Sequence, residues 1–377
     1  MINRLFVAFR QFGFGNQRTV PSLDGLRAIS IAFVLFCHLC GTRHFPGKIS
    51  FFTLRFGEFG VRVFFVISGY LITSILLAEL WSKGTISLAR FYFRRTLRLF
   101  PARYFFILVV AILAMKEFVT LEPWDLTHAI TYTMNFHDAR AWSLGHLWSL
   151  AVEEHFYLLW PGLLAWVGAR RSKNLAARLA LAVALWRMVQ SQFAASVFAL
   201  IPAHFRTDVR LDALLWGCVV AFILDNADAR ARLAKQLQFG VWFAMAGLLG
   251  LCIVYYSEIT SVMVAVLIPM LLAGTTLHPR WALSRALDWA PVAWIGRISY
   301  SLYLWQALFL YPGWEHPAHW WQQWPANLPV TVAVAALSYY VIEKPLQRVG
   351  RKLASQSLSQ SRDASSGLKQ SALAALK

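Results

Sequence analysis

Apolar runs recur along most of the chain, and short polar or charged segments separate them. A helix needs about 20 apolar residues to cross the hydrocarbon core of a bilayer. The alternation therefore predicts an all-α, polytopic membrane helical bundle of about ten transmembrane helices. The expected spans are residues 23–41, 59–78, 101–119, 146–167, 175–192, 209–224, 239–256, 259–277, 294–311 and 326–342.

The composition agrees with a membrane protein. Of the 377 residues, 58% are hydrophobic and only 14% are charged, whereas about a quarter of the residues in a soluble domain are charged. We expect one ten-span membrane domain at residues 21–345, preceded by a basic cytoplasmic lead-in at 1–20. Residues 346–377 are basic and then rich in Ser, Gln and Ala, so we expect a disordered or weakly helical cytoplasmic tail.

A net charge of +18 would suit nucleic-acid binding if the charge formed one patch. Instead, Lys and Arg are concentrated near both termini and in alternate short loops between the apolar runs. This is the pattern of the positive-inside rule, and it predicts that both termini lie in the cytoplasm. We therefore expect membrane lipids, and no nucleic acid, among the partners. Arginines interrupt the first apolar residues, so no cleavable signal peptide is predicted.

The first span carries ionisable residues on one face. Arg27 and His38 lie eleven positions apart, which is about three helical turns and about 16 Å along the axis. Asp24 lies one turn before Arg27. Buried charge is costly in lipid, so this face is expected to contact protein or a watery cavity. A neutral histidine can serve as a general base and an arginine can bind an anion; the alternative is a pair of structural polar groups.

A basic stretch at 91–106 leads into the third span. It contains Arg94, Arg95 and Arg98 within little more than one helical turn. Three guanidinium groups at the inner membrane surface suit a polyanionic ligand such as the phosphates of coenzyme A. The alternative is an anchor that binds anionic lipid headgroups.

The fourth span also contains polar groups. Its residues His146, Ser149, Glu153 and Tyr157 follow one stripe of a helix, at steps of three and four, while Glu154 is predicted to point elsewhere. A glutamate in an apolar span needs a partner or a water-lined cavity. Glu153 is therefore a candidate for orienting a histidine or binding a sugar hydroxyl, and the alternative is an interhelical hydrogen bond that fixes packing.

Three smaller signals bear on packing and on metals. Ser68 and Gly69 interrupt the second span, where small residues let backbones approach closely. Cys37 and Cys40 flank His38 in a CxxC pattern, but a buried apolar helix does not suit a zinc or redox site. We expect no metal and no disulfide framework.

Seven segments taken together resemble the acyltransferase 3 family of integral-membrane acyltransferases, which includes O-acetylases of surface polysaccharides and lipopolysaccharide. They follow the order of the family's motifs and cover residues 22 to 345. The segments are SLDGLRAISIAFVLFCH at 22–38, FFVISGYLIT at 64–73, FYFRRTLRLFPARY at 91–104, LWSLAVEEHFYLLWP at 147–161, RLDALLWG at 210–217, ISYSLYLW at 298–305 and IEKP at 342–345.

The resemblance implies roles for the charged residues. The family's arginine, ten residues, histidine motif falls on Arg27 and His38. Its Arg-x-x-Arg motif falls on Arg95 and Arg98, and its paired glutamates fall on Glu153 and Glu154. The family is thought to move an acyl group from cytoplasmic acyl-CoA to an acceptor at the outer face. The resemblance thus implies that His38 is the essential catalytic residue and that Arg27 helps to place the donor.

Two positions depart from related patterns. Many family members continue the YSLYLW motif with a histidine, whereas this chain has Gln306 there. Glycerolipid acyltransferases carry a His-x4-Asp motif, and Arg43 stands at that spacing from His38. The first departure puts in doubt any role carried over to position 306, and the second argues against phospholipid synthesis.

These observations predict a multi-pass acyltransferase of the bacterial inner (cell) membrane. It would pass an acyl group, most simply acetyl, from acyl-CoA to a hydroxyl of a cell-surface or lipid-linked glycan. His38 would be the general base or a transient acyl carrier, the Arg94, Arg95 and Arg98 cluster would hold the donor, and no cofactor would be permanently bound. The rival is a non-enzymatic transporter, flippase-like protein or membrane sensor, which a ten-span bundle would also suit.

Overall fold

The protein is built from helices, as the computed structural model shows for residues 22–197, 205–255, 257–313 and 319–350. Within these ranges every element of regular secondary structure is helical, which confirms the all-α class. The α-helices are α2 Leu23–Leu39, α3 Phe51–Lys83, α4 Leu88–Met115, α5 Asp125–Ile130, α6 Trp142–Gly145, α7 Leu147–Val167, α8 Ala169–Val197, α9 Thr207–Asp225, α10 Ala227–Gln236, α11 Phe239–Val254, α12 Glu258–Leu277, α13 Ala282–Leu287, α14 Ala290–Arg297, α15 Ser299–Phe309 and α16 Asn327–Ser338. Short 3₁₀ turns lie at Met134–Phe136 and Trp320–Gln322, and the π-helical turn Tyr339–Glu343 follows α16.

The predicted lead-in at 1–20 lies outside the described residues, as does most of the predicted tail. Residues 346–350 are described, and they continue the helix that follows Glu343. The division into a lead-in, one membrane domain and a tail stays a prediction.

Three described helices are long and apolar enough to cross a membrane: Phe52–Lys83, Leu88–Met115 and Ile259–Leu277. The pair α10 and α11 meets the same criterion as one span, with a bend of 77° between its halves. The count of ten spans and the orientation of the termini stay predictions.

The segment between the predicted second and third spans, residues 79–100, is largely helical. Helix α3 runs for 33 residues to Lys83, where Gly84 adopts φ 76° and ends it, since glycine enters the left-handed region without a Cβ penalty. Helix α4 begins four residues later and continues through Pro101. The arginines of this stretch therefore project from a helix, which fixes their directions relative to one another.

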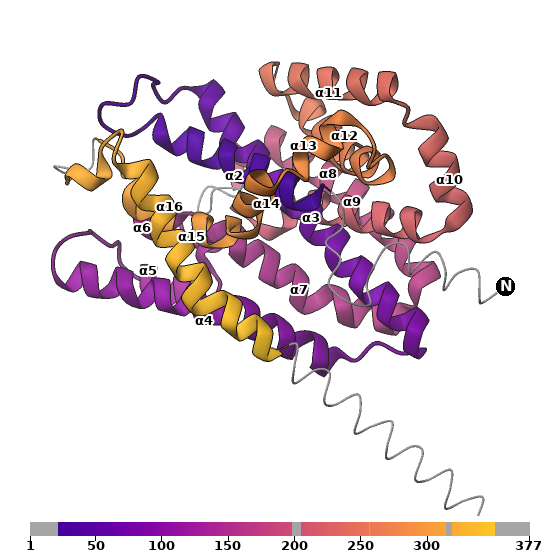
Figure 1. Ribbon diagram of the computed structural model, residues 1–377, viewed down its shortest axis with the longest axis horizontal. Coiled ribbons are helices and arrows are strands. Elements are labelled where there is room, and N and C mark those ends of the chain that lie inside the picture. The colour runs from indigo at the N-terminus through magenta and orange to yellow at the C-terminus, as the bar shows by residue number, and fades with distance from the viewer. Residues whose placement is uncertain (1–21, 198–204, 256, 314–318, 351–377) are drawn as a thin grey trace, which may run out of the picture.

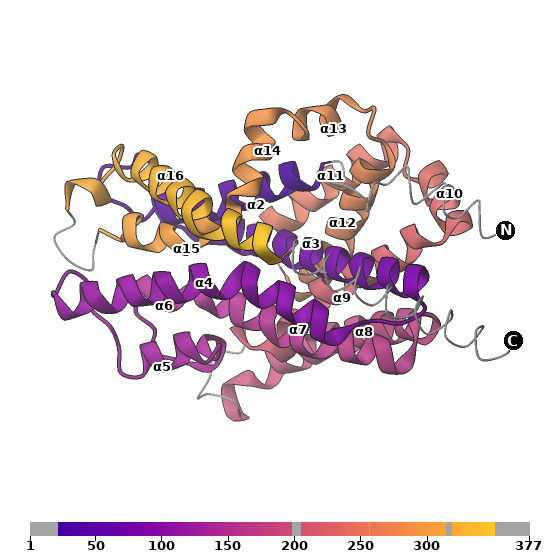
Figure 2. The same cartoon turned by 60° about the horizontal axis from the view of Figure 1, so that its bottom comes forward.

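The predicted ninth span, 294–311, is broken. Helix α14 ends at Arg297 and α15 begins at Ser299, with Ile298 between them. Figure 2 shows the two helices running in different directions. The break presents Arg297, Ser299 and Tyr300 beside the pocket described below.

Helix α3 packs against both α2 and α9 at the centre of the bundle (Figure 1). Gly69 of α3 and Gly217 of α9 lie where these two helices cross at close range. A Cβ built on Gly69 would lie 1.9 Å from the carbonyl oxygen of Leu214, and one on Gly217 would lie 2.2 Å from that of Val66. The backbones therefore touch, as the small residues at 68–69 predicted.

Paired charges also join the helices around α3. Glu58 accepts hydrogen bonds from Arg62, at 3.2 Å, and from Arg210 of α9, at 2.7 Å. Arg62 also donates to the Ser261 hydroxyl of α12 at 2.8 Å. Because an isolated buried charge is costly in an apolar bundle, its neutralisation within a hydrogen-bonded cluster favours one arrangement of α3, α9 and α12.

Candidate active site

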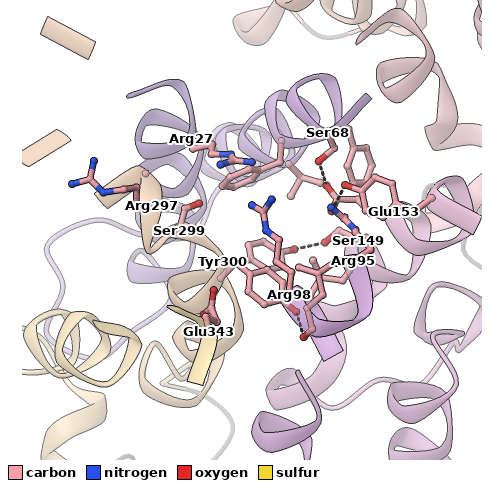
Figure 3. Close-up of a pocket in the computed structure, with 18 of the residues that line it drawn as sticks. Arg27, Ser68, Arg95, Arg98, Ser149, Glu153, Arg297, Ser299, Tyr300 and Glu343 are labelled. Carbon is pink, nitrogen blue, oxygen red and sulfur yellow. Dashed lines mark hydrogen bonds between the residues drawn. The ribbon is translucent and has the colours of Figure 1, made fainter. Parts of the chain in front are cut away.

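A pocket of about 90 Å³ opens where α2, α3, α4, α7, α14 and α15 converge. Figure 3 shows its charged side chains, with Arg27 and Arg98 pointing toward one another. Four arginines and two glutamates belong to the lining, so the pocket is cationic. These six residues are Arg27, Arg95, Arg98, Glu153, Arg297 and Glu343.

The stripe predicted on the fourth span lines one wall of this pocket. Ser149, Glu153 and Tyr157 all contribute to the lining, whereas His146 does not. Glu153 accepts hydrogen bonds from the Ser68 hydroxyl at 2.9 Å and from the Tyr157 hydroxyl at 3.1 Å. Its carboxylate thereby joins α7 to the Ser-Gly interruption of α3.

The paired glutamates face different neighbours. Glu154 lies 3.6 Å from Arg95 Nε, and the Arg95 guanidinium lies 3.4 Å from the centre of the Tyr157 ring. Arg95 is thus held between a carboxylate and an aromatic face. Glu154 is not one of the lining residues, in agreement with the prediction that it points elsewhere than Glu153.

Arg98 is the arginine most available to a ligand. It is exposed, points into the pocket (Figure 3), and has no hydrogen bond or ion pair to any described residue. Arg27, by comparison, lies 3.7 Å from Asp24. Two guanidinium groups that face each other favour an anion in the space they share.

The third arginine of the basic stretch lies away from the pocket. Arg94 contacts Glu79 of α3 at 3.9 Å, beside Lys83 and Arg90, which bind the same carboxylate at 3.0 and 3.1 Å. The predicted cluster is therefore divided between two sites, because side chains one residue apart on a helix point about 100° apart.

His38 lies outside the pocket lining, farther along α2. Its Nδ1 atom forms a short hydrogen bond with Oε1 of Gln306 on α15. The centre of its ring lies 4.9 Å from that of Trp142, in an edge-to-face arrangement. Sequence analysis missed Trp142, and it singled out Gln306 only as a departure from a motif.

Polar residues fill the interval between His38 and the pocket. The Tyr303 ring belongs to the pocket lining, and its hydroxyl lies 2.6 Å from Ser149 Oγ and donates to the backbone oxygen of His146 at 3.1 Å. The imidazole of His146 packs edge-on against the same tyrosine, with ring centres 5.5 Å apart. The arginine pocket and His38 are thus the two ends of one polar region.

The pocket also contains residues that sequence analysis did not assign. Glu343 is buried, with 3% of its surface exposed, and accepts a short hydrogen bond from Ser301. The sequence feature that could have identified Glu343 is a carboxylate at the end of an apolar run, inside the IEKP segment. Arg297 had a weaker signal, as a lone cation before the ISYSLYLW segment.

The connection between α4 and α7 brings Trp142 to His38. Buried Asp125 accepts hydrogen bonds from the backbone nitrogens of Glu122, at 2.8 Å, and Ala141, at 3.1 Å. His137 lies 3.2 Å from the other oxygen of Asp125 and stacks on His128 with ring centres 4.4 Å apart. Burial, and then the neighbouring His137, lowers the pKa of His128, which favours its neutral form.

Among the described residues, no group of three or more His, Cys, Asp or Glu side chains has the geometry of a metal site. Cys37 and Cys40 are buried free thiols.

Comparison with known proteins gives the family. The sequence model of the acyltransferase 3 family, described as an acyltransferase domain, matches residues 20–343. The chain is 31% identical to the putative peptidoglycan O-acetyltransferase YrhL of Bacillus subtilis, over 89% of the chain and 56% of the relative. It is 30% identical to the O-acetyltransferase OatA of Staphylococcus aureus and 29% identical to the peptidoglycan O-acetyltransferase OatA of Listeria monocytogenes.

These two matches cover 89% of the chain and 58% and 57% of the relatives, so the chain spans a little over half the length of all three. No solved structure matches. Because the family model covers most of the chain, the assignment rests on the whole set of helices that forms the pocket and carries His38. The chain belongs to the acyltransferase 3 family.

Proposed function

We propose that this protein is a membrane O-acetyltransferase that moves an acetyl group from cytoplasmic acetyl-CoA to a hydroxyl of a cell-envelope glycan. The observation that carries the proposal is the placement of Arg27 in a cationic pocket while His38, on the same helix, lies about 16 Å farther along. Peptidoglycan is the first candidate acceptor, because the names of two relatives state it.

The two ends of the polar region suit the two ends of acetyl-CoA. Its phosphates carry negative charge, and Arg27 and Arg98 present guanidinium groups that match phosphate geometry. Its thioester lies at the far end of a long flexible arm, which would pass Ser149 and Tyr303 to reach His38. Glu153 and Glu154 hold Tyr157 and Arg95 in place, so their role is to support the wall of the donor site.

The reaction at His38 moves the acetyl group from the sulfur of coenzyme A to the oxygen of the acceptor hydroxyl. The acceptor hydroxyl oxygen attacks the thioester carbonyl carbon, and the His38 ring takes the hydroxyl proton. When the carbonyl re-forms, the carbon–sulfur bond breaks, and the leaving thiolate takes the proton from His38. The products are an O-acetylated glycan and free coenzyme A. A general base of this kind contributes about 10² to 10⁴ in rate.

The experiment that tests this function uses cells that carry the wild-type gene or lack it. Isolated envelope glycans are treated with mild alkali, and the released acetate is measured. More acetate from cells with the gene than from cells without it supports the proposal. If the two kinds of cells release equal acetate from peptidoglycan and from every other envelope glycan, the proposal is contradicted. Thermal stabilisation of the purified protein by coenzyme A separates an acyltransferase from a transporter or sensor that is indifferent to the donor.

Replacing Arg98 with glutamine tests the donor site. We expect Arg98→Gln to raise the dissociation constant for coenzyme A by about tenfold or more, because a hydrogen bond to a charged group contributes about 1.5–3 kcal/mol. The shift in unfolding temperature across a coenzyme A titration measures this change. Arg90→Gln is the matched control, since Arg90 projects from the same helix but binds Glu79; equal weakening in both variants would contradict the assignment.

A further inference from the structure

Two polar nitrogens beside His38 lack a partner among the described residues. They are the side-chain nitrogen Nε2 of Gln306 and the indole nitrogen of Trp142. Buried polar groups in proteins are nearly always hydrogen-bonded, because leaving one unpaired costs about 1–3 kcal/mol. Unpaired donors gathered next to a candidate catalytic histidine therefore indicate that a ligand supplies the missing acceptor.

Only the oxygen of the Gln306 side-chain amide has a hydrogen-bond partner among the described residues. Its Oε1 accepts from Nδ1–H of His38, and its side chain has no exposed surface. This contact fixes the His38 tautomer, because an amide oxygen accepts a hydrogen bond and takes up no proton. The lone pair of His38 Nε2 is then free to act as the base. The Gln306 N–H groups remain as unused donors on the same amide.

Trp142 offers the second donor, and a hydrogen bond of the preceding residue holds it in position. It is the first residue of α6, directly after Ala141, whose backbone nitrogen donates to buried Asp125. Helix α6 in turn contacts α15, the helix that carries Gln306. The Trp142 ring meets His38 edge-on, so the indole and the Gln306 amide approach the imidazole from two different elements.

We propose that the Gln306 amide N–H and the Trp142 indole N–H bind the carbonyl oxygen of the acyl group and stabilise its negative charge during transfer. This inference rests on the proposed acetyl transfer. As the acceptor oxygen bonds to the carbonyl carbon, the π electrons of the carbonyl move to its oxygen, and the two N–H groups donate to it. When those electrons return, the carbon–sulfur bond breaks. Donors placed in advance at such an oxygen typically contribute about 10²–10³ in kcat each.

The test uses inverted membrane vesicles that retain their own glycans, supplied with radiolabelled acetyl-CoA over a range of concentrations. Alkali-labile label in the glycan fraction is measured per amount of the protein. We expect Trp142→Phe, which removes the N–H and keeps an aromatic ring, to lower kcat about 100-fold and to change KM for acetyl-CoA less than about threefold. Trp305→Phe is the matched control, because it also removes an unpaired indole N–H, from a ring that faces Phe105 and Phe106.

A second variant separates the donor from the positioning contact. Gln306→Glu keeps an acceptor oxygen for His38 Nδ1–H and removes the amide N–H groups. We expect kcat to fall by a similar factor, about 100-fold. If Gln306→Glu matches wild type in kcat, the inference is overturned and Gln306 is a positioning residue alone. If Trp142→Phe does not fold, the Gln306→Glu result alone tests the inference.

The outcomes for the wild type and the variants are distinct. Wild-type vesicles that transfer no label overturn the proposed function, and the inference falls with it. Active wild type with an equally active and folded Trp142→Phe overturns the inference and leaves the proposed function intact. Coenzyme A should stabilise the Trp142→Phe and Gln306→Glu variants as much as it stabilises the wild type, because neither position lines the arginine pocket.

Discussion

Replacing His38 with alanine is expected to lower acetylation of the envelope glycan by at least about 100-fold, because the variant lacks the proposed general base. Binding of coenzyme A should persist, since the arginine pocket lies about three helical turns away. Acetate released by mild alkali from isolated glycans gives the activity, and the shift in unfolding temperature with coenzyme A gives donor binding, both at matched membrane levels of the protein.

This combination of results separates a catalytic role of His38 from a structural one. A structural histidine supports the contact between α2 and α15, so its loss would lower the unfolding temperature and weaken donor binding together with activity. His44→Asn is the control, because His44 is exposed and adopts φ 64°, which asparagine tolerates. Full acetylation by a folded His38→Ala variant would show that His38 is not the base.

Much of the pocket wall follows from helical periodicity alone. Arg27, Arg95, Arg98 and Glu153 each lie on a face that the sequence marks, because a polar group in an apolar span must avoid lipid. Periodicity also separated Glu153 from Glu154, which the structure places against Arg95. The directions of these side chains could be predicted because each depends on the geometry of a single helix. The roles proposed for the residues stay predictions.

The remaining features depend on contacts between segments far apart in the chain. His38 and Gln306 are 268 positions apart, and no local pattern relates them. Glu343 enters the pocket because a π-helical turn carries it. Arg94 pairs with Glu79 because only four residues separate the end of α3 from the start of α4, which places the two helix ends side by side. The predicted ninth span likewise combined parts of α14 and α15. The break at Ile298 changes the direction of the chain but not the hydropathy of the sequence, so the sequence pattern does not reveal it.

Adding one methyl group at Gly69 is expected to destabilise the folded protein by about 2 kcal/mol or more. A Cβ at this position would lie 1.9 Å from the Leu214 carbonyl oxygen, so α3 and α9 must separate, and overpacking of this kind typically costs about 1–3 kcal/mol. The unfolding temperature in detergent and the yield of monodisperse protein measure the effect. Gly247→Ala is the control: its Cβ would meet nothing within 4 Å, and alanine favours a helix over glycine by about 1 kcal/mol.

The nature of this contact sharpens the prediction. The obstructing atom at Gly69 belongs to the backbone, so shortening the neighbouring side chain with Leu214→Ala should not restore stability to Gly69→Ala. Recovery in the double variant would show that side chains, and not backbones, set the spacing of α3 and α9. Separation of the two helices would also move Ser68, which donates to Glu153 in the wall of the arginine pocket. Weaker binding of coenzyme A by Gly69→Ala, measured below its unfolding temperature, is therefore expected to accompany its lower stability.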